Sequence, residues 1–233
     1  MDTQSRAIKD QIQMPQDNCS KNFTDFDLSF ILGKGYAYFM SRIASTTPPA
    51  DAVMPVRHPK APAIGSQIPS HFGHCYGCGE LHKTGLHFTA IAGKDLDLTG
   101  SFTVTENHQG APGLAHGGLL SLAFDEAMGK LMWLIRTPAV TGRLETDFLM
   151  PVPMGRTLFI NAKITGQSGR KIYVEAEGRL DSVTGDLAVK AAAIFIAVPM
   201  QHFISNLTAE YKEHLKQHPG LLAFVDPDFD INP

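Results

Sequence analysis

The sequence is short of the residues that build cross-linked or membrane-spanning proteins. Only three cysteines and one tryptophan occur in 233 residues. Three cysteines cannot all pair within one chain, so we expect no disulfide-built fold, in agreement with a reducing compartment. The longest apolar run, Ala191 to Val198, is far shorter than the roughly 20 residues of a membrane-spanning helix. We therefore expect no membrane span.

Charge is also scarce, and neither sign dominates. Charged residues make up 18% of the chain and the formal net charge is -3, so we expect no general attraction to nucleic acid or to an anionic membrane. Residues 1–13 are polar and lack the apolar stretch of a secretory signal, which makes a cytoplasmic location the expectation. Hydrophobic residues, at 43%, suffice for a core and exclude wholesale disorder.

Composition divides the chain into three zones. Residues 1–70 are interpreted as an N-terminal extension, helical to about residue 47 and then rich in proline, which favours an extended linker over a surface. Its many aromatic residues suggest that the helical part docks on the rest of the protein. Residues 71–200 carry nearly all the periodic pattern and form the predicted main domain. Residues 201–233 form a tail with a short helix predicted at 206–217.

The order of elements in residues 71–200 predicts an α+β fold. Two strand-like runs, 86–91 and 96–104, precede a segment at 119–135 that is apolar on nearly every side and predicts a buried helix. Further strands are predicted at residues 143–150, 157–166, 172–180 and 187–198. Their short connections favour an antiparallel meander. One antiparallel sheet wrapped around one long central helix satisfies this order, because it buries the helix and leaves the outer face wet.

Two glycines and an acid mark the predicted helix as a candidate site. Gly117 and Gly118 lie where a first helical turn leaves N–H groups without internal partners and the helix dipole is positive. A carbonyl oxygen that gains negative charge would be stabilised there. Asp125 stands among apolar neighbours, where a carboxylate needs a partner or a task. Turn roles for the glycines and a surface role for Asp125 or the adjacent Glu126 stay open on these residues alone.

The run Pro112 to Gly118, with Asp125 nine residues after His116, resembles the hotdog-fold acyl-CoA thioesterases, and among them the phenylacetyl-CoA-thioesterase-like branch. The resemblance covers about Cys75 to Val198. It implies a hotdog fold and the hydrolysis of an acyl- or aryl-CoA thioester to a free acid and CoA, without a cofactor. It also implies a homodimer or a dimer of dimers, since one subunit exposes a sheet edge and half of each pocket.

The resemblance assigns catalytic roles to five residues. Asp125 acts as general base or nucleophile and faces the pocket across a dimer interface. The backbone amides of Gly117 and Gly118 polarise the thioester carbonyl. His116 supports the thioester site by shaping the turn. Thr141 orients the attacking water, although an ordinary strand position remains an equal reading.

Three further residues are implied in substrate binding. Asp147 stands where relatives often carry Asn, and the resemblance implies that it faces the same region as the catalytic acid. Arg170 and Lys171 lie in a tight turn, from which basic side chains would attract the phosphates of CoA. A solvated hairpin turn is an equally good reading of these two.

A Cys-x-x-Cys motif, Cys75 and Cys78, has His71, His74 and His82 around it. A zinc site needs four ligands, usually as two pairs, and no second cysteine pair is present. Redox chemistry would need the motif at the start of a helix in a βαβ unit, and the sequence around Cys75 and Cys78 does not predict such a unit. We therefore predict no metal, and expect this segment to pack against the central helix.

Two other classes of function stay open. A hotdog hydratase or dehydratase would use a His paired with an acid, which His116 and Asp125 would have to imitate. A non-catalytic acyl-CoA-binding or scaffold protein would bind the thioester without turnover.

Overall fold

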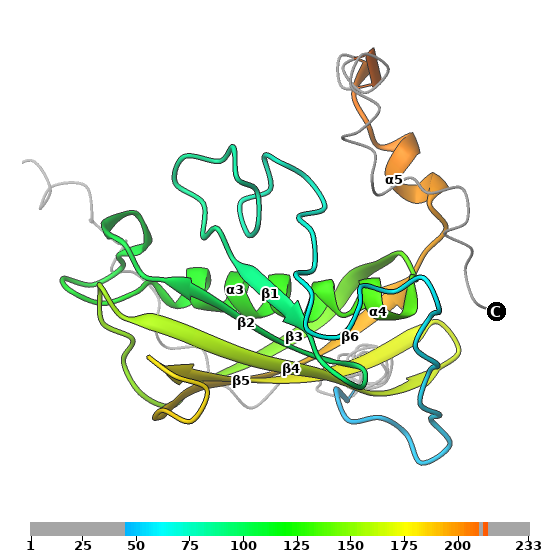
Figure 1. The fold of residues 1–233 in the computed structure, drawn as a ribbon, viewed down its shortest axis with the longest axis horizontal. Helices are drawn as coiled ribbons and strands as arrows, with labels where there is room; N and C mark the ends of the chain where they lie inside the picture. The colour runs from blue at the N-terminus through cyan, green and yellow to red at the C-terminus, as the bar shows by residue number, and fades with distance from the viewer. Residues whose placement is uncertain (1–44, 210–211, 214–233) are drawn as a thin grey trace, which may run out of the picture. The chain divides into compact units, whose positions relative to one another are not determined.

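Six antiparallel strands form one sheet that wraps around a central helix (Figure 1). The computed structural model describes residues 45–209 and 212–213. The strands are β1 (Thr89–Ala92), β2 (Asp97–Thr103), β3 (Ala139–Phe148), β4 (Thr157–Ser168), β5 (Lys171–Leu180) and β6 (Leu187–Ala197). The helices are η2 (Glu106–His108), α3 (Gly117–Lys130), α4 (Met132–Ile135) and α5 (Gln201–Ser205). The predicted α+β architecture, with a sheet around one long helix, is confirmed. None of the described helices is long and apolar enough to cross a membrane.

The central helix is buried on most sides, as its composition predicts. Ala123, Phe124, Ala127 and Met128 are fully inaccessible to solvent. Helix α3 packs closely on the sheet at Gly178 of β5, where a Cβ would lie 2.7 Å from the Phe124 ring. The predicted 119–135 segment is realised as α3 and α4, which meet at Leu131.

The strand order is β1-β2-β4-β5-β6-β3, so the predicted meander is wrong for β3. Strand β3 pairs with β6 instead of β4, because residues 149–156 do not turn back as a hairpin. The amide of Ala115 donates to the carbonyl of Val152, and that of Val104 donates to the carbonyl of Arg156. The connection thus passes the start of α3 and delivers β4 to the side of β2, which leaves β6 as the neighbour of β3.

A β-bulge interrupts β3 near its start. Thr141 lies opposite Phe195, but Arg143 lies opposite Ile194, so Gly142 is an extra residue. Phe195 faces the helix, since its ring would contact a Cβ at Gly129 of α3. Because side chains alternate along a strand, one inserted residue reverses which face the later residues take.

The two edges of the sheet differ. Residues 65–68 cover the free edge of β1: Gly65 donates to the carbonyl of Ala92, and Ile68 donates to that of Ala90. In the described part of the chain, β3 is paired on one side only, with β6. One edge is therefore closed by the protein's own chain, and the other presents unpaired N–H and C=O groups.

The proline-rich segment lies against the barrel. Val53 bridges to Gln167, and the Arg57 guanidinium donates to three carbonyls, those of Pro62, Gly93 and Asp95. Residues from Ser45 onward consequently group as one compact unit, whereas the sequence suggested a boundary at residue 70. The predicted helical part of the N-terminal extension and its docking fall almost wholly outside the described residues. Of the predicted 206–217 helix, only Ala209, Lys212 and Glu213 are described as helical, and α5 precedes it.

Candidate active site

Helix α3 and strand β3 bring together two of the predicted site residues. The Thr141 hydroxyl donates a 2.6 Å hydrogen bond to Oδ1 of Asp125. Asp125 is half-buried and Thr141 is exposed, so water can reach the pair. The bond fixes the orientation of the carboxylate, which is the requirement for a positioned general base.

The entry to α3 is built around His116. This residue is the N-cap, and its Nδ1 accepts a 2.9 Å hydrogen bond from the amide of Gly118. The expectation that both glycine amides polarise a carbonyl is therefore corrected: the Gly118 N–H is already bound by the cap. The Gly117 amide makes no hydrogen bond among the described residues. The Gly117 N–H is thus an unpaired donor at the start of α3. Because glycine has no side chain, a ligand can approach this N–H closely.

Within one subunit, Gly117 and Asp125 do not form a single site. They are eight residues apart on one helix, which corresponds to about 12 Å along its axis. The Phe148 ring lies 3.5 Å from the position of a Cβ at Gly117, whereas Thr141 contacts Asp125. Helix α3 thus runs antiparallel to β3. One end of this pair carries the acid, and the other carries the free amide beside an exposed Phe148.

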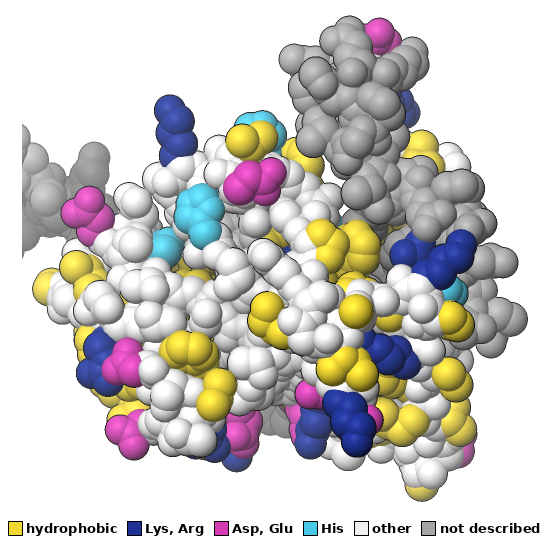
Figure 2. Space-filling model, viewed as in Figure 1, with side chains coloured by type: hydrophobic (Ala, Val, Ile, Leu, Met, Phe, Trp, Pro, Cys, Tyr) yellow, Lys and Arg dark blue, Asp and Glu magenta, His cyan; other side chains and the backbone are white. Residues whose placement is uncertain are grey.

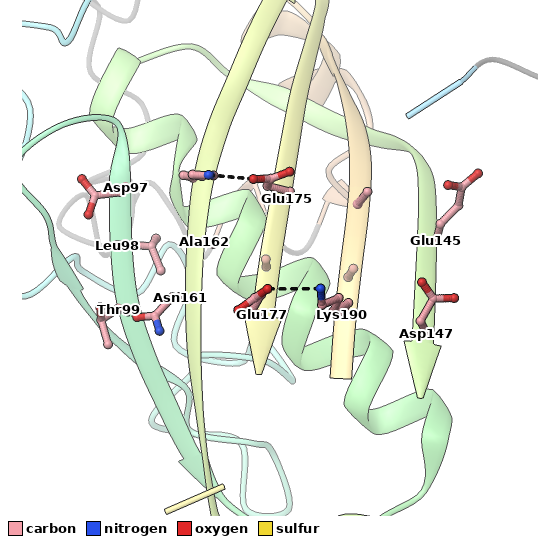
Figure 3. Close-up of a pocket in the computed structure, with 14 residues that line it drawn as sticks. Asp97, Leu98, Thr99, Glu145, Asp147, Asn161, Ala162, Glu175, Glu177 and Lys190 are labelled. Atoms are coloured by element: carbon pink, nitrogen blue, oxygen red, sulfur yellow. Dashed lines mark hydrogen bonds and ion pairs between the residues drawn. The ribbon is translucent and has the colours of Figure 1, made fainter. Parts of the chain in front are cut away.

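Asp147 does not share the face of Asp125, and that expectation is corrected. It lies on the outer face of the sheet, in an open groove of about 770 Å³ that also contains Glu145, Glu177 and Lys190 (Figure 3). The bulge at Gly142 is the reason, because it reverses the alternation between Thr141 and Asp147. In its register Asp147 lies directly opposite Lys190, so its neighbours are the charged residues of the outer face.

Arg170 and Lys171 are exposed in the β4–β5 turn. Gly169 takes a positive φ of 55° there, and the Arg170 carbonyl accepts from the amide of Ala197. Lys171 lies opposite Ile196, and Ile196 lies opposite Val140 at the start of β3. The turn is thus two strands away from the end of β3 that holds Thr141.

A second group of reactive side chains lies on the other side of α3. One ligand atom from each of His71, Cys75, Cys78 and Glu126 falls within 4.8 Å of all the others. The segment from residue 71 lies over α3 on the side away from the sheet, and Lys130 binds it through a 2.9 Å hydrogen bond to the carbonyl of Pro69 (Figure 1). The expected packing of this segment on the central helix is present.

Burial and mutual contacts change the titration of this group. Burial, and after it the charge and hydrogen bond of Cys78, raise the pKa of Glu126 to about 7, although Lys130 and His71 oppose the shift. A hydrogen bond from Cys78 lowers the pKa of Cys75 to about 7, although burial opposes it. Burial lowers the pKa of His71, but the hydrogen bond and charge of Cys78, with the charge of Glu126, raise it more.

Glu126 is the residue that sequence reasoning missed in this group. It stands 51 residues from Cys75 and next to Asp125, and it was weighed only as a surface charge. Its polar position in a helix that is otherwise apolar was the available signal. No metal was predicted because a second cysteine pair is absent, whereas in the folded chain Glu126 and His71 lie beside the two cysteines.

Part of the chain matches the model of a known protein family. Residues 112–184 match the family model described as Thioesterase superfamily. This confirms the resemblance to hotdog-fold thioesterases over the segment that contains the helix entry, Asp125 and Thr141. The match ends before β6, and it does not include residues 71–85, which carry His71, Cys75 and Cys78.

Among curated proteins, the chain is 30% identical over 90 residues to the acyl-coenzyme A thioesterase THEM4 of Xenopus laevis. The match covers 38% of this chain and 39% of that relative. Among solved structures, similar chains include the thioesterase superfamily protein RHA08564, with 20% identity, a TM-score of 0.49 and coverage of 82% and 85% of the two chains. The E. coli PaaI protein from the phenylacetic acid degradation operon has 20% identity, a TM-score of 0.45 and coverage of 49% and 81%.

Proposed function

We propose that this protein is an acyl-CoA thioesterase that hydrolyses an acyl- or aryl-CoA thioester to a free acid and CoA. The observation that carries the proposal is the 2.6 Å hydrogen bond from Thr141 to Asp125, within a segment that matches the Thioesterase superfamily. The similarity to an acyl-coenzyme A thioesterase supports the substrate class. Asp147 has no part in the proposed site.

In the proposed reaction, Asp125 acts as the general base. Thr141 holds the carboxylate through Oδ1, and a water bound to the carboxylate loses its proton as its oxygen attacks the thioester carbonyl. The carbonyl oxygen becomes negative and is stabilised by the Gly117 amide at the positive end of α3. The tetrahedral intermediate then expels the CoA thiolate, which takes the proton back from Asp125. His116 supports the site indirectly, since it caps the helix that presents Gly117.

A complete site needs two subunits. One carbonyl cannot reach both Asp125 and Gly117 of the same helix, because its reacting groups must lie within about 3 to 3.5 Å of their partners. The unpaired edge of β3 offers the joining surface. A two-fold axis midway between Thr141 and Phe148 would bring Asp125 to Gly117 of the partner subunit, since α3 and β3 run antiparallel. We propose a homodimer with two sites, to which the turn residues Arg170 and Lys171 contribute charge for the CoA phosphates.

The test is a hydrolysis screen that measures released CoA thiol across acyl chain lengths and aryl-CoAs. Turnover of at least one saturated or aryl thioester, lost in Asp125→Asn, supports the proposal. Addition of water to an enoyl-CoA without CoA release would instead identify a hydratase. That alternative required His116 to pair with Asp125, whereas Asp125 binds Thr141 and His116 Nδ1 binds the Gly118 amide. Tight binding of every thioester without turnover would identify a binding protein.

A further inference from the structure

The group of His71, Cys75, Cys78 and Glu126 has the composition of a metal site. Two thiols, an imidazole and a carboxylate are the donors that zinc takes in proteins, and thiolate ligands disfavour calcium and magnesium. Three of the four come from residues 71–78 before β1, and the fourth comes from α3. Four protein ligands leave no open position, which is the pattern of a structural site instead of a hydrolytic one.

The separations between the ligand atoms fit a tetrahedron. Cys78 Sγ lies 3.4 Å from His71 Nδ1, and Cys75 Sγ lies 3.5 Å from Glu126 Oε2. His71 Nδ1 lies 3.9 Å from Glu126 Oε1. Metal bonds of about 2.0 to 2.3 Å give a tetrahedron with edges of roughly 3.3 to 3.8 Å. The 3.4 and 3.5 Å separations lie in this range, and the others, up to 4.8 Å, would shorten as the side chains close on the ion.

Glu126 points into the group without a sufficient partner. Its side chain is only 9% exposed, and its Oε1 atom is buried without a hydrogen bond. The nearest cations, His71 Nδ1 and Lys130 Nζ, stand 3.9 and 3.7 Å from Oε1. A buried carboxylate oxygen with no hydrogen bond destabilises the fold unless something else binds it. This observation is independent of the cysteine motif and also favours a bound cation at this group.

The loop that carries the cysteines is shaped around the group. The Gly77 amide donates to Cys75 Sγ at 3.3 Å, which stabilises a thiolate, and Ser70 Oγ lies 3.3 Å from Cys78 Sγ. A Cβ at Gly77 would collide with the Glu126 carboxylate. Glycine at this position therefore allows the loop and α3 to approach closely enough to share one ion.

A bound divalent cation would leave this group electrically balanced. Two thiolates and the Glu126 carboxylate carry three negative charges, and the Lys130 ammonium, which is 3% exposed, supplies one positive charge. Zinc supplies the other two. The group can therefore hold a dication on two thiolates without leaving uncompensated charge inside the protein.

We propose that His71, Cys75, Cys78 and Glu126 bind one zinc ion that fastens the segment before β1 to the central helix. This inference goes beyond the proposed hydrolysis and does not depend on it, and it replaces the sequence-based expectation of no metal. Binding releases the thiol protons and adds stability to the folded chain, since the ligands converge only when α3 and the loop are in place.

The test uses the full-length chain, purified without chelators, and elemental analysis for metal. We expect one zinc per chain, with X-ray absorption showing two sulfur and two nitrogen or oxygen ligands. Cys75→Ser, Cys78→Ser and Glu126→Gln should each weaken zinc binding at least about tenfold. His74→Ala is the matched control, because His74 is exposed, lies in the same loop and is outside the group. It should keep the metal.

Two measurements on the unaltered protein test the proposal even if a variant fails to fold. Exchange of zinc for cobalt(II) should produce a thiolate-to-metal charge-transfer absorption, and zinc removal should lower the melting temperature reversibly. The proposal is overturned if the reduced protein holds no zinc and takes up none in competition with a chelator. A Cys75–Cys78 disulfide that persists under anaerobic purification, or zinc that Cys75→Ser retains and His74→Ala loses, overturns it too.

Discussion

Thr141 and Asp125 are 16 residues apart in sequence and 2.6 Å apart in space. The contact joins the middle of the central helix to the start of the edge strand β3, on the side of the bulge where side chains still face the helix. Because the hydroxyl donates to Oδ1, it fixes the orientation of the carboxylate. This pair is the basis of the first two predictions.

Replacing Asp125 with Asn should abolish thioester hydrolysis. An amide has nearly the same shape but cannot accept a proton from water, so kcat should fall on the order of 10²-fold or more. Released CoA thiol measures the rate. Circular dichroism and melting temperature should match the unaltered protein. Near-normal turnover with unchanged KM would show that Asp125 is not the base.

Thr141→Val should lower kcat by about 10- to 100-fold, because a misplaced catalytic group loses rate on this scale. Thr141→Ser keeps the hydroxyl and should retain most activity. A purely structural role predicts instead that the two variants differ in melting temperature and not in kcat. The comparison of kcat and stability across both variants decides between these roles.

Gly117→Pro should remove the single free amide at the helix start while preserving the helix. Gly117 is the first helical residue, where proline is tolerated, and His116 before it has an extended ψ of 129°. Loss of one oxyanion donor should lower kcat by about 10²- to 10³-fold. Gly117→Ala keeps the N–H, and its Cβ would meet Phe148 at an ordinary 3.5 Å. Equal activity of the two variants would exclude the amide from the reaction.

Mixing two inactive variants should restore activity if each site uses two subunits. Asp125→Asn and Gly117→Pro, co-expressed with different tags, should give mixed dimers in which one of the two sites is intact. The unfractionated mixture should recover about a quarter of the normal rate, because about half of the dimers are mixed, and the purified mixed dimer should recover about half. The purified mixed dimer is assayed for CoA release. An inactive mixed dimer would mean that one subunit contains the whole site.

Gly178→Ala should destabilise the protein by crowding the contact between β5 and α3. Its Cβ would lie 2.7 Å from the Phe124 ring and 3.3 Å from Leu158 in a fully buried contact. Overpacking of this kind lowers the free energy of unfolding by about 1 to 3 kcal/mol. Denaturant titration measures it. Glu175→Ala, on the exposed side of the same strand, serves as the control and should change stability far less. Adding Phe124→Leu should recover part of the loss, because it removes the clashing atoms.

Periodicity predicted the fold well where each element's neighbours are local. The apolar run over 119–135 and the alternation in β5 correspond to a buried helix and a strand with one wet face. The partner of β3 could not be predicted in the same way. It depends on the path of residues 149–156, whose hydrogen bonds to Val104 and Ala115 form only in the folded chain.

The resemblance selected Asp125 and Thr141, which the fold brings into contact, and their catalytic roles stay predictions. Gly118 was misassigned because its N–H donates to the His116 side chain, and this bond depends on the His116 rotamer. Asp147 was misassigned because one bulged residue, Gly142, reverses the strand face. Glu126 was overlooked because its partners come from a loop more than 40 residues earlier in the chain. All three errors concern geometry that sequence spacing does not encode.

The unequal edges of the sheet limit how the protein can assemble. Within the described residues, the edge at β1 is sealed by residues 65–68, and the edge at β3 is the one left unpaired. A fibre that grows by strand addition needs every chain to offer two open edges. A chain with one open edge can form a pair, after which no edge remains for a third. Association through β3 is thus self-terminating, and any larger assembly would have to use a face of the barrel.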